Sequence, residues 1–277
     1  MFGSTLATAM FQLVRPDASR ETPVIVEVPH AGLAIPADVR PQIVVGDGTI
    51  LRDSDLYVDR LFARAPERGA TLLASGLSRY VVDLNRAPDD VDRQTVRDHP
   101  APRPTQSRGV VWRSTTEGQP ALREPITHVE LERRLARYHT PYHAALEAEI
   151  QRKRTRFGHA IVVAGHSMPS TGKGGQGRRA DIVPGSRGRT SAAAAVIDLV
   201  ERHFAAAGLS VKHDDPYRGG WSTQRYGQPE HGVHAIQIEI NRALYADEAT
   251  GEPDAAGVAR IEALLLSLLD ALGALAV

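Results

Sequence analysis

The chain contains no cysteine among its 277 residues. This absence excludes disulfide bonds, thiolate metal sites and a cysteine nucleophile. A metal ion bound to this chain would take nitrogen and oxygen ligands. The 11 histidines and the carboxylates are the available donors.

An excess of charge of one sign is also missing, because 33 Lys and Arg residues balance 33 Asp and Glu residues. Nucleic acid is not expected as a partner, since phosphate binding needs a basic surplus. No apolar run approaches the roughly 18 residues of a membrane span. Residues 1–15 lack a basic region before their weakly apolar stretch, which favours mature sequence over a signal peptide. We expect a cytoplasmic protein with no membrane partner, and the sequence leaves its oligomeric state open.

Short apolar runs alternate with helical patterns along the chain. The predicted strands are residues 24–28, 160–164, 209–212 and 235–240, together with 78–86 as a strand that runs into a turn. A small apolar run lies at 70–74. The helical patterns are residues 51–64, 124–154, 190–207 and the stretch from 253 onward. Thr190 or Ser191 is expected to cap the third of these. Pro141 is expected to kink or divide the second of these. The alternation predicts an α/β fold, with a mixed, largely parallel sheet covered by helices on both faces.

Residues 1–277 are expected to form a single α/β metallohydrolase domain with long loops around its site. These loops are predicted at about 87–120, 165–190 and 213–230. Loops of such length without regular structure are usually functional or disordered.

Two histidines stand at the ends of apolar runs. His30 follows the run in TPVIVEVPHAG, and His166 follows the run in AIVVAGHSM. A third run, in HAIQIEINR, carries Glu239 near its end. Ligands bind at the carboxyl ends of strands in open α/β sheets. Two histidines and a carboxylate at such ends indicate a metallohydrolase centre.

A catalytic zinc ion takes three protein ligands and leaves one position for water. His30 and His166 are the nitrogen donors, and the third ligand should be a carboxylate. The familiar pattern places Glu three residues after the first histidine, but that position is Leu33. The next source is the cluster of Asp53, Asp55 and Asp59, from which we favour Asp55 and then Asp53. All three could instead serve only the first turns of a helix, where carboxylates suit its dipole.

Glu239 is the candidate for relaying protons to the leaving nitrogen. Its isoleucine neighbours predict burial, and a buried carboxylate needs a partner or a function. A structural ion pair with Arg242 or Arg225 is the competing interpretation.

The stretch SRYVVDLNR supplies groups for a substrate carboxylate. A planar guanidinium grips a carboxylate with paired hydrogen bonds, so Arg79 and Arg86, with Asn85 beside them, suit that task. Asp83 could orient an arginine or a histidine from behind. An Asx turn with surface arginines explains the same letters equally well.

From about residue 24 to 247 the chain resembles the N-formylglutamate amidohydrolase family, within the zinc-dependent exopeptidase-like group that includes carboxypeptidases and aspartoacylases. Each matching motif is short, but their number and order make the likeness strong. They are VEVPHAG, DSDLYVDRLF, SRYVVDLNR, YHTPYH, GHSMPS, RADIVPGSRGRTS, DDPYRGG, TQRYG and IQIEINRALY.

The resemblance implies a phosphorylase/hydrolase-like α/β fold and one Zn²⁺ per chain. The implied metal ligands are His30, Asp55 and His166, and the implied general base and acid is Glu239. The implied substrate-carboxylate and oxyanion group is Arg79, Asn85 and Arg86. The loop from Pro216 to Arg225 and the Gly-rich loop after His166 are implied to close over the substrate, with Arg218 and Arg225 as substrate-binding residues.

The reaction implied by the resemblance is hydrolysis of N-formyl-L-glutamate to formate and L-glutamate, late in histidine breakdown. Another N-acyl amino acid or a small peptide is the alternative substrate. A non-catalytic anion-binding protein is the alternative class, against which all the implied metal ligands and Glu239 are present.

Three departures from the family pattern bear on the acyl group and the amino acid rather than on the hydrolase class. Asp214 stands where the family pattern has Asn. Arg242 and Ala243 follow Glu-Ile-Asn in place of polar residues. The residues AGHSM replace a more acidic approach to His166.

Overall fold

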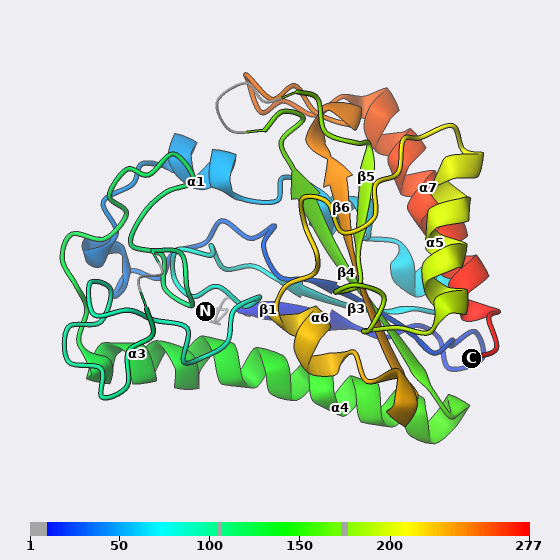
Figure 1. Ribbon diagram of the computed structural model, residues 1–277, viewed down its shortest axis with the longest axis horizontal. Coiled ribbons are helices and arrows are strands. Elements are labelled where there is room, and N and C mark those ends of the chain that lie inside the picture. The colour runs from blue at the N-terminus through cyan, green and yellow to red at the C-terminus, as the bar shows by residue number, and fades with distance from the viewer. Residues whose placement is uncertain (1–9, 105–106, 173–176) are drawn as a thin grey trace, which may run out of the picture.

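The computed structural model describes residues 10–104, 107–172 and 177–277. The start of the N-terminal stretch read as mature sequence, and short parts of two predicted loops, therefore lie outside the described residues. A six-stranded sheet forms the centre of the molecule (Figure 1). Its strands, in spatial order, are β1 (Phe11–Val14), β3 (Thr71–Ser75), β2 (Val24–Val28), β4 (Ala160–Met168), β6 (Val233–Asn241) and β5 (Ile182–Gly185).

The four inner strands run parallel, and the two edge strands run antiparallel to their neighbours. This confirms the predicted mixed, largely parallel sheet. Every residue of β2, β3, β4 and β6 is buried. Strands covered on both faces read as continuous apolar runs, which is why these four could be found in the sequence.

Helices cover both faces of the sheet (Figure 1). The helices of the described chain are α1 (Asp47–Asp53), α2 (Val58–Leu61), α3 (His128–Arg134), α4 (Thr140–Phe157), α5 (Ala194–Ala206), α6 (Trp221–Tyr226) and α7 (Ala255–Gly273). Short 3-10 turns lie at Arg40–Gln42, Ala65–Arg68, Pro229–His231 and Arg242–Leu244. In the described part of the chain, no helix combines the length and the apolar character needed to cross a membrane.

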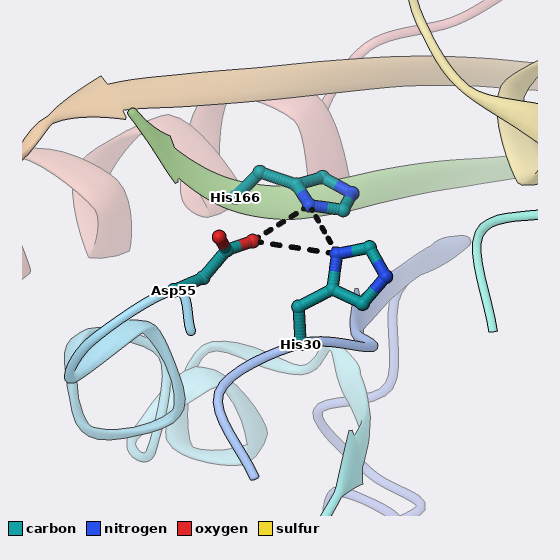
Figure 2. A group of neighbouring side chains, drawn as sticks. All are labelled: His30, Asp55 and His166. Carbon is teal, nitrogen blue, oxygen red and sulfur yellow. Dashed lines mark hydrogen bonds and ion pairs between the residues drawn. The ribbon is translucent and has the colours of Figure 1, made fainter. Parts of the chain in front are cut away.

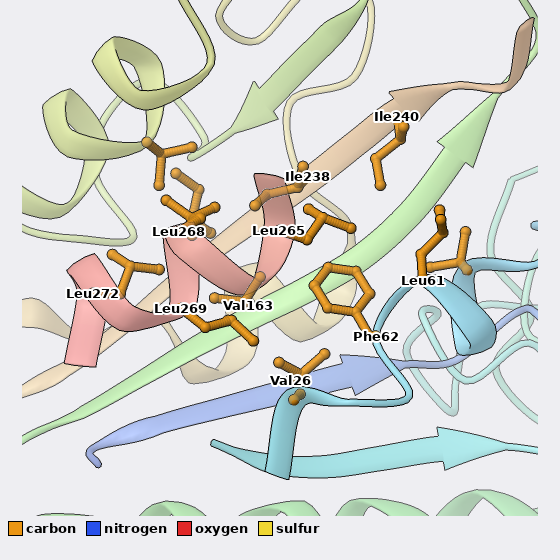
Figure 3. Packing of buried hydrophobic residues seen from close by; sticks show 14 of the residues in the cluster. Val26, Leu61, Phe62, Val163, Ile238, Ile240, Leu265, Leu268, Leu269 and Leu272 are labelled. Carbon is orange, nitrogen blue, oxygen red and sulfur yellow. The ribbon is translucent and has the colours of Figure 1, made fainter. Parts of the chain in front are cut away.

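Helix α7 supplies much of the packing on one face of the sheet (Figure 3). Its Leu265, Leu268 and Leu269 are completely buried and belong to one apolar cluster with Val163 and Ile238 of the strands. Full burial of each such side chain stabilises the fold by roughly 1.5–3 kcal/mol. The side chain of Asp254 caps this helix by accepting from two backbone N–H groups of its first turn.

Helix α4 covers the opposite face with a second cluster. Tyr142 and Leu146 are fully buried there with Ile25 and Val162 of the sheet. The same cluster includes apolar residues from the long irregular segment between β3 and α3. In its described part, residues 87–120 contain no helix or strand, as predicted.

The prediction of a strand at residues 78–86 was wrong. The backbone there forms consecutive turns, in which Val81 N–H donates to the Ser78 carbonyl and Arg86 N–H to the Asp83 carbonyl. Its apolar side chains are buried all the same. A buried run indicates a strand only when neighbouring strands pair with it, and this segment joins the cluster under α4 instead.

Other predicted boundaries differ from the structure. Pro141 does not interrupt the helical structure, which runs on from α3 to α4 through a π-helical segment, Leu135–His139, just before the proline. Such a wider turn accommodates a residue that has no N–H to donate. Residues 209–212 form no strand and make only an isolated bridge at Val211. The pattern read as one helix at 51–64 is two short helices, α1 and α2, with Asp55 between them.

Helix α5 begins at Ala194 rather than at the predicted cap, Thr190 or Ser191. The hydroxyl of Ser191 donates to the Ala235 carbonyl instead, at 2.7 Å.

Candidate metal centre and active site

Three side chains from separate segments converge at the carboxyl edge of the sheet (Figure 2). His30 lies on the turn after β2, Asp55 lies between α1 and α2, and His166 lies within β4. The sequence predicted that His166 would follow its strand, but β4 continues through it to Met168. The Asp55 N–H donates to the His30 carbonyl at 3.0 Å, which ties the two loop segments together.

The spacing of the donor atoms suits a small cation. Nδ1 of His30 lies 3.3 Å from Nδ1 of His166, and Asp55 Oδ2 lies 2.8 Å from the His166 atom and 3.6 Å from the His30 atom. Tetrahedral zinc with bonds of about 2.0–2.1 Å separates its ligand atoms by roughly 3.3 Å. The donor set, two imidazoles and a carboxylate with no sulfur, is that of catalytic zinc sites.

A second carboxylate orients the His30 ring from behind. Nε2 of His30 lies 2.7 Å from Asp83 Oδ1, and the indole of Trp112 donates to the other Asp83 oxygen at 2.9 Å. Burial opposes ionisation of Asp83, but the charges of His30 and Arg79 outweigh it and lower its pKa. An ionised Asp83 can only accept, so the proton sits on Nε2 and the Nδ1 lone pair is free for a metal.

The protonation states of the other two ligands also favour metal binding. Burial raises the pKa of Asp55, but the Arg79 charge and the interactions with His166 and His30 reverse this and hold it well below its usual range. Burial lowers the pKa of His166, although the hydrogen bond to Asp55 and its negative charge act to raise it. Metals bind ionised carboxylates and neutral imidazoles.

The structure separates the three candidate aspartates. Asp53 accepts from the Tyr80 hydroxyl, from the Thr116 N–H at 3.0 Å and from the Thr116 hydroxyl at 2.5 Å. These contacts hold the segment around Thr116 in place. Asp59 is exposed on α2. Only Asp55 of the three joins the histidines.

Glu239 lies beside the three clustered side chains. It is 5% exposed, and it is the register partner of His166 on the adjacent parallel strand. Gln237 donates to Glu239 Oε1 at 2.8 Å. The competing interpretation, an ion pair with Arg242, is not what the structure contains: Arg242 donates to the carbonyls of Arg52 and Ser54, at 3.0 and 2.9 Å.

The electrostatic surroundings of Glu239 favour a bound proton. Burial, and then the negative charge of Asp55, raise the pKa of Glu239 well above its usual range. Arg79, Arg242 and the hydrogen bond from Gln237 oppose this only in part. A carboxyl group with such a raised pKa suits proton transfer near neutral pH.

Two buried amides connect these parts of the site. Asn85 Nδ2 lies 3.2 Å from His166 Nε2 and donates to Gln237 Oε1 at 3.3 Å. The same Gln237 oxygen accepts from the Gly220 N–H at 2.9 Å, while Asn85 Oδ1 accepts from the Ser222 N–H at 3.0 Å. A Cβ atom at Gly220 would lie 2.3 Å from Asn85, so only glycine fits there.

Sequence reasoning missed Gln237. The available signal was its spacing of two residues from Glu239, which puts both side chains on one face of a strand.

Arg79 lies against the metal centre itself. Its Nη2 contacts Nδ1 of His30, its Nη1 donates to the Asp53 carbonyl at 3.2 Å, and its guanidinium lies 4.7 Å from the Trp112 ring centre. A fixed positive charge therefore borders the cluster.

A cavity of about 820 Å³ opens above the cluster and contains Glu239 in its lining. Its lining includes seven arginines: Arg52, Arg79, Arg86, Arg108, Arg179, Arg218 and Arg242. It also includes six carboxylates: Asp53, Asp55, Asp83, Glu117, Glu239 and Glu248. Arg86 and Arg218, both predicted to bind substrate, are thus at the cavity.

Arg225, also predicted to bind substrate, lies elsewhere. It pairs with Glu147 of α4, with Nε 3.1 Å from Oε1, and lines a separate cavity of about 450 Å³. The neighbouring Glu147 carboxylate holds its guanidinium on the outside of α4.

Comparison with known proteins places the chain in a family. Residues 22–246 match the N-formylglutamate amidohydrolase family. The chain belongs to that family. It is 34% identical to the N-formylglutamate deformylase of Pseudomonas aeruginosa and 30% identical to that of Pseudomonas putida. Each alignment covers 230 residues and 82% of this chain, and 83% and 82% of the respective relative.

Solved structures agree with this assignment. The crystal structure of N-formylglutamate amidohydrolase from Ralstonia eutropha matches with a TM-score of 0.86 and 32% identity, covering 96% of this chain and 97% of that chain. A gene product of Agrobacterium tumefaciens matches with a TM-score of 0.68 and 21% identity over 95% and 96%, a likeness of fold alone. As a member of the family, the protein is an amidohydrolase.

Within this amidohydrolase, Asp214 has a structural task. Its backbone is left-handed, with φ of 56°, and its side chain accepts from the Ser186 N–H at 2.8 Å and from the Gly188 N–H. Asn would offer only one acceptor oxygen to these two donors. The departure from the family pattern at this position therefore serves the turn.

Proposed function

We propose that this amidohydrolase is zinc-dependent and hydrolyses N-formyl-L-glutamate to formate and L-glutamate. The observation that carries the proposal is the cluster of His30, Asp55 and His166 beside Glu239, in a cavity rich in arginine. The names of the relatives support the choice of substrate.

A zinc ion held by His30, Asp55 and His166 would polarise the formyl carbonyl and supply activated water at neutral pH. The remaining chemistry belongs to the chain. The positive charge of a bound zinc ion would favour ionised Glu239, which could then accept the proton that the attacking water gives up. Glu239 passes this proton to the leaving nitrogen as the carbon–nitrogen bond breaks. Arg79, fixed over Trp112, stabilises the negative charge that develops on the carbonyl oxygen.

The charge of the cavity suits a dianion. Its seven arginines outnumber its six carboxylates, and one of those carboxyls, Glu239, has a raised pKa. A bound zinc ion would add two further positive charges. Arg86 and Arg218 are proposed as substrate-binding groups, with Asn85 beside Arg86 at His166.

The proposal includes the wider setting of the reaction. We take residues 1–277 as one domain, since a single sheet draws its strands from residues 11 to 241. A cytoplasmic location and a role late in histidine breakdown rest on the likeness to the named deformylases.

A substrate panel with metal analysis tests the proposal. Purified protein should contain about one zinc ion per chain and release formate fastest from N-formyl-L-glutamate. Equal rates from other N-formyl amino acids would contradict the narrow assignment, and faster release of acetate from N-acetyl amino acids would favour a different N-acyl substrate. A zinc-loaded protein that binds these anions without turnover would be a non-catalytic member of the family.

A further inference from the structure

One arginine of the cavity is held in place without a carboxylate partner. Arg179 lies between β4 and β5, where its Nη1 donates to the Pro169 carbonyl at 2.9 Å. Its guanidinium carbon lies 5.5 Å from the centre of the Tyr217 ring. No carboxylate among residues 10–104, 107–172 and 177–277 is within ion-pair distance of it. Neutral groups thus fix a full positive charge at the cavity wall.

Nearby arginines are occupied differently. Arg52 pairs with Glu117 at 3.2 Å, and Arg242 holds two backbone carbonyls. Arg178, next to Arg179 in the chain, pairs with Asp181 at 3.3 Å. Carboxylates thus neutralise Arg52 and Arg178, and backbone carbonyls occupy the buried Arg242, whereas Arg179 is held by neutral groups at the cavity wall.

Glu248, an acidic side chain of the cavity lining, is already engaged by this loop. Glu248 accepts from the N–H of Ser170 at 2.8 Å and from the Ser170 hydroxyl. These contacts hold the loop that carries Pro169 and leave the charge of Arg179 for a ligand.

Tyr217 links Arg179 to the reacting centre. Both residues line the cavity that contains Glu239. Tyr217 is also three residues before Gly220, whose N–H is bonded to Gln237, the donor to Glu239. The ring that supports Arg179 is thereby tied to the group proposed to move the proton.

We propose that Arg179, supported by Tyr217, binds the side-chain carboxylate of the substrate and makes the enzyme select acidic over neutral N-formyl amino acids. This inference rests on the proposed function. The α-carboxylate, next to the scissile nitrogen, falls to Arg86, whose neighbour Asn85 contacts His166. The second carboxylate, two methylene groups further out, needs another fixed cation, and preorganised guanidinium groups bind carboxylates best.

Formate release from N-formyl-L-glutamate and from its neutral isostere N-formyl-L-glutamine tests the inference in zinc-loaded protein. Wild type should prefer the glutamate derivative by about 10²-fold in kcat/KM, the scale of a charge-assisted hydrogen-bonded pair. Arg179→Gln should remove most of that preference by lowering kcat/KM for N-formylglutamate alone. Arg179→Lys should keep part of it, because the charge remains without the planar fork.

Arg178→Gln is the matched control, since its guanidinium pairs with Asp181 outside the cavity lining. It should leave both rates unchanged. A loss shared by both compounds in Arg179→Gln, with the wild-type preference for N-formyl-L-glutamate intact, would overturn the inference while the proposed function stands. Equal wild-type rates on the two compounds would overturn the inference together with the narrow substrate assignment. No formate from either compound with wild type would instead overturn the proposed function. Melting temperatures and zinc content of each variant separate these results from misfolding.

Discussion

The two ends of strand β2 contain the same kinds of charged residue in opposite arrangements. At the amino end, Glu21 accepts from Arg152 at 2.5 Å and from Lys153 at 2.8 Å, while Glu149 accepts from Arg15 and Arg152 at 2.6 and 2.7 Å. Each buried carboxylate there has at least two cationic donors. The hydrogen bond from Arg152 and the charge and hydrogen bond of Lys153 outweigh burial and lower the pKa of Glu21 to about 2.

At the carboxyl end, the carboxylates crowd together instead. Asp55, Asp83 and Glu239 all share the positive charge of Arg79. The pKa values of Asp55 and Asp83 fall, but that of Glu239 rises. At the amino end, cations neutralise each carboxylate and stabilise the fold. At the carboxyl end, the negative charges are only partly neutralised, so one carboxyl can hold a proton and the others can bind a cation.

Removing a metal ligand at the carboxyl end should reduce activity more than any other substitution considered at the two ends of β2. His30→Ala, Asp55→Ala and His166→Ala should each lose zinc and nearly all formate release, while melting as folded proteins, because the ligands lie at the edge of the sheet rather than in the apolar clusters. Asp59→Ala is the control and should keep both properties. Zinc analysis, turnover and melting on one preparation give the answer. Full zinc occupancy in Asp55→Ala would show that another carboxylate is the ligand.

Glu239→Gln should have the next largest effect. Turnover should fall by about 10²–10⁴-fold, the usual contribution of a general acid–base group, with KM changed far less. Zinc content should stay the same. The melting temperature should not fall, because the raised pKa of Glu239 means that its ionised form is costly to bury. Normal turnover with intact zinc would remove Glu239 from the mechanism.

Glu21→Gln should produce the reverse pattern at the other end of β2. The folded pKa of Glu21, about 2, is below the 4.5 that is usual for a glutamate side chain. The stabilisation is therefore present above pH 4.5 and is lost as the pH falls toward 2. At neutral pH the variant should lose about 3 kcal/mol of unfolding free energy, at roughly 1.4 kcal/mol per pKa unit. Turnover per folded molecule should be unchanged.

Urea unfolding of wild type and Glu21→Gln at several pH values measures this difference. The gap in unfolding free energy should close on acidification. A gap independent of pH would mean that the substitution acts through packing.

The fold was largely predictable because its central strands are buried on both faces. Their apolar runs, as at 24–28 and 235–240, are local features of the sequence. Residues 78–86 were mispredicted as a strand because they are also apolar and buried, although the segments that bury them are distant in the chain. Their turned backbone lets Asp83 and Asn85 contact the two histidines. Whether such a buried run forms a strand or a turn depends on the segments that pack against it, which are far away in the chain.

The site residues that could be predicted are those identified by residue type and by their position at the end of an apolar run. His30, Asp55 and His166 do converge. The position of Arg225 depends on a tertiary ion pair with Glu147, which no local pattern contains. Arg179 resembled any basic loop residue until the structure revealed that its neighbour has an acidic partner and it does not.

The register between β4 and β6 has a consequence for how chain length can vary in this family. His166 and Glu239 are opposite each other in the ladder. Inserting or deleting one residue in β6 before Glu239 would turn its side chain to the other face and bring an isoleucine to the metal centre. Insertions in the irregular segments before and after these strands leave that pairing intact. Insertions and deletions should therefore be found in the loops that contact the substrate and be absent from β6, the strand that contains Glu239.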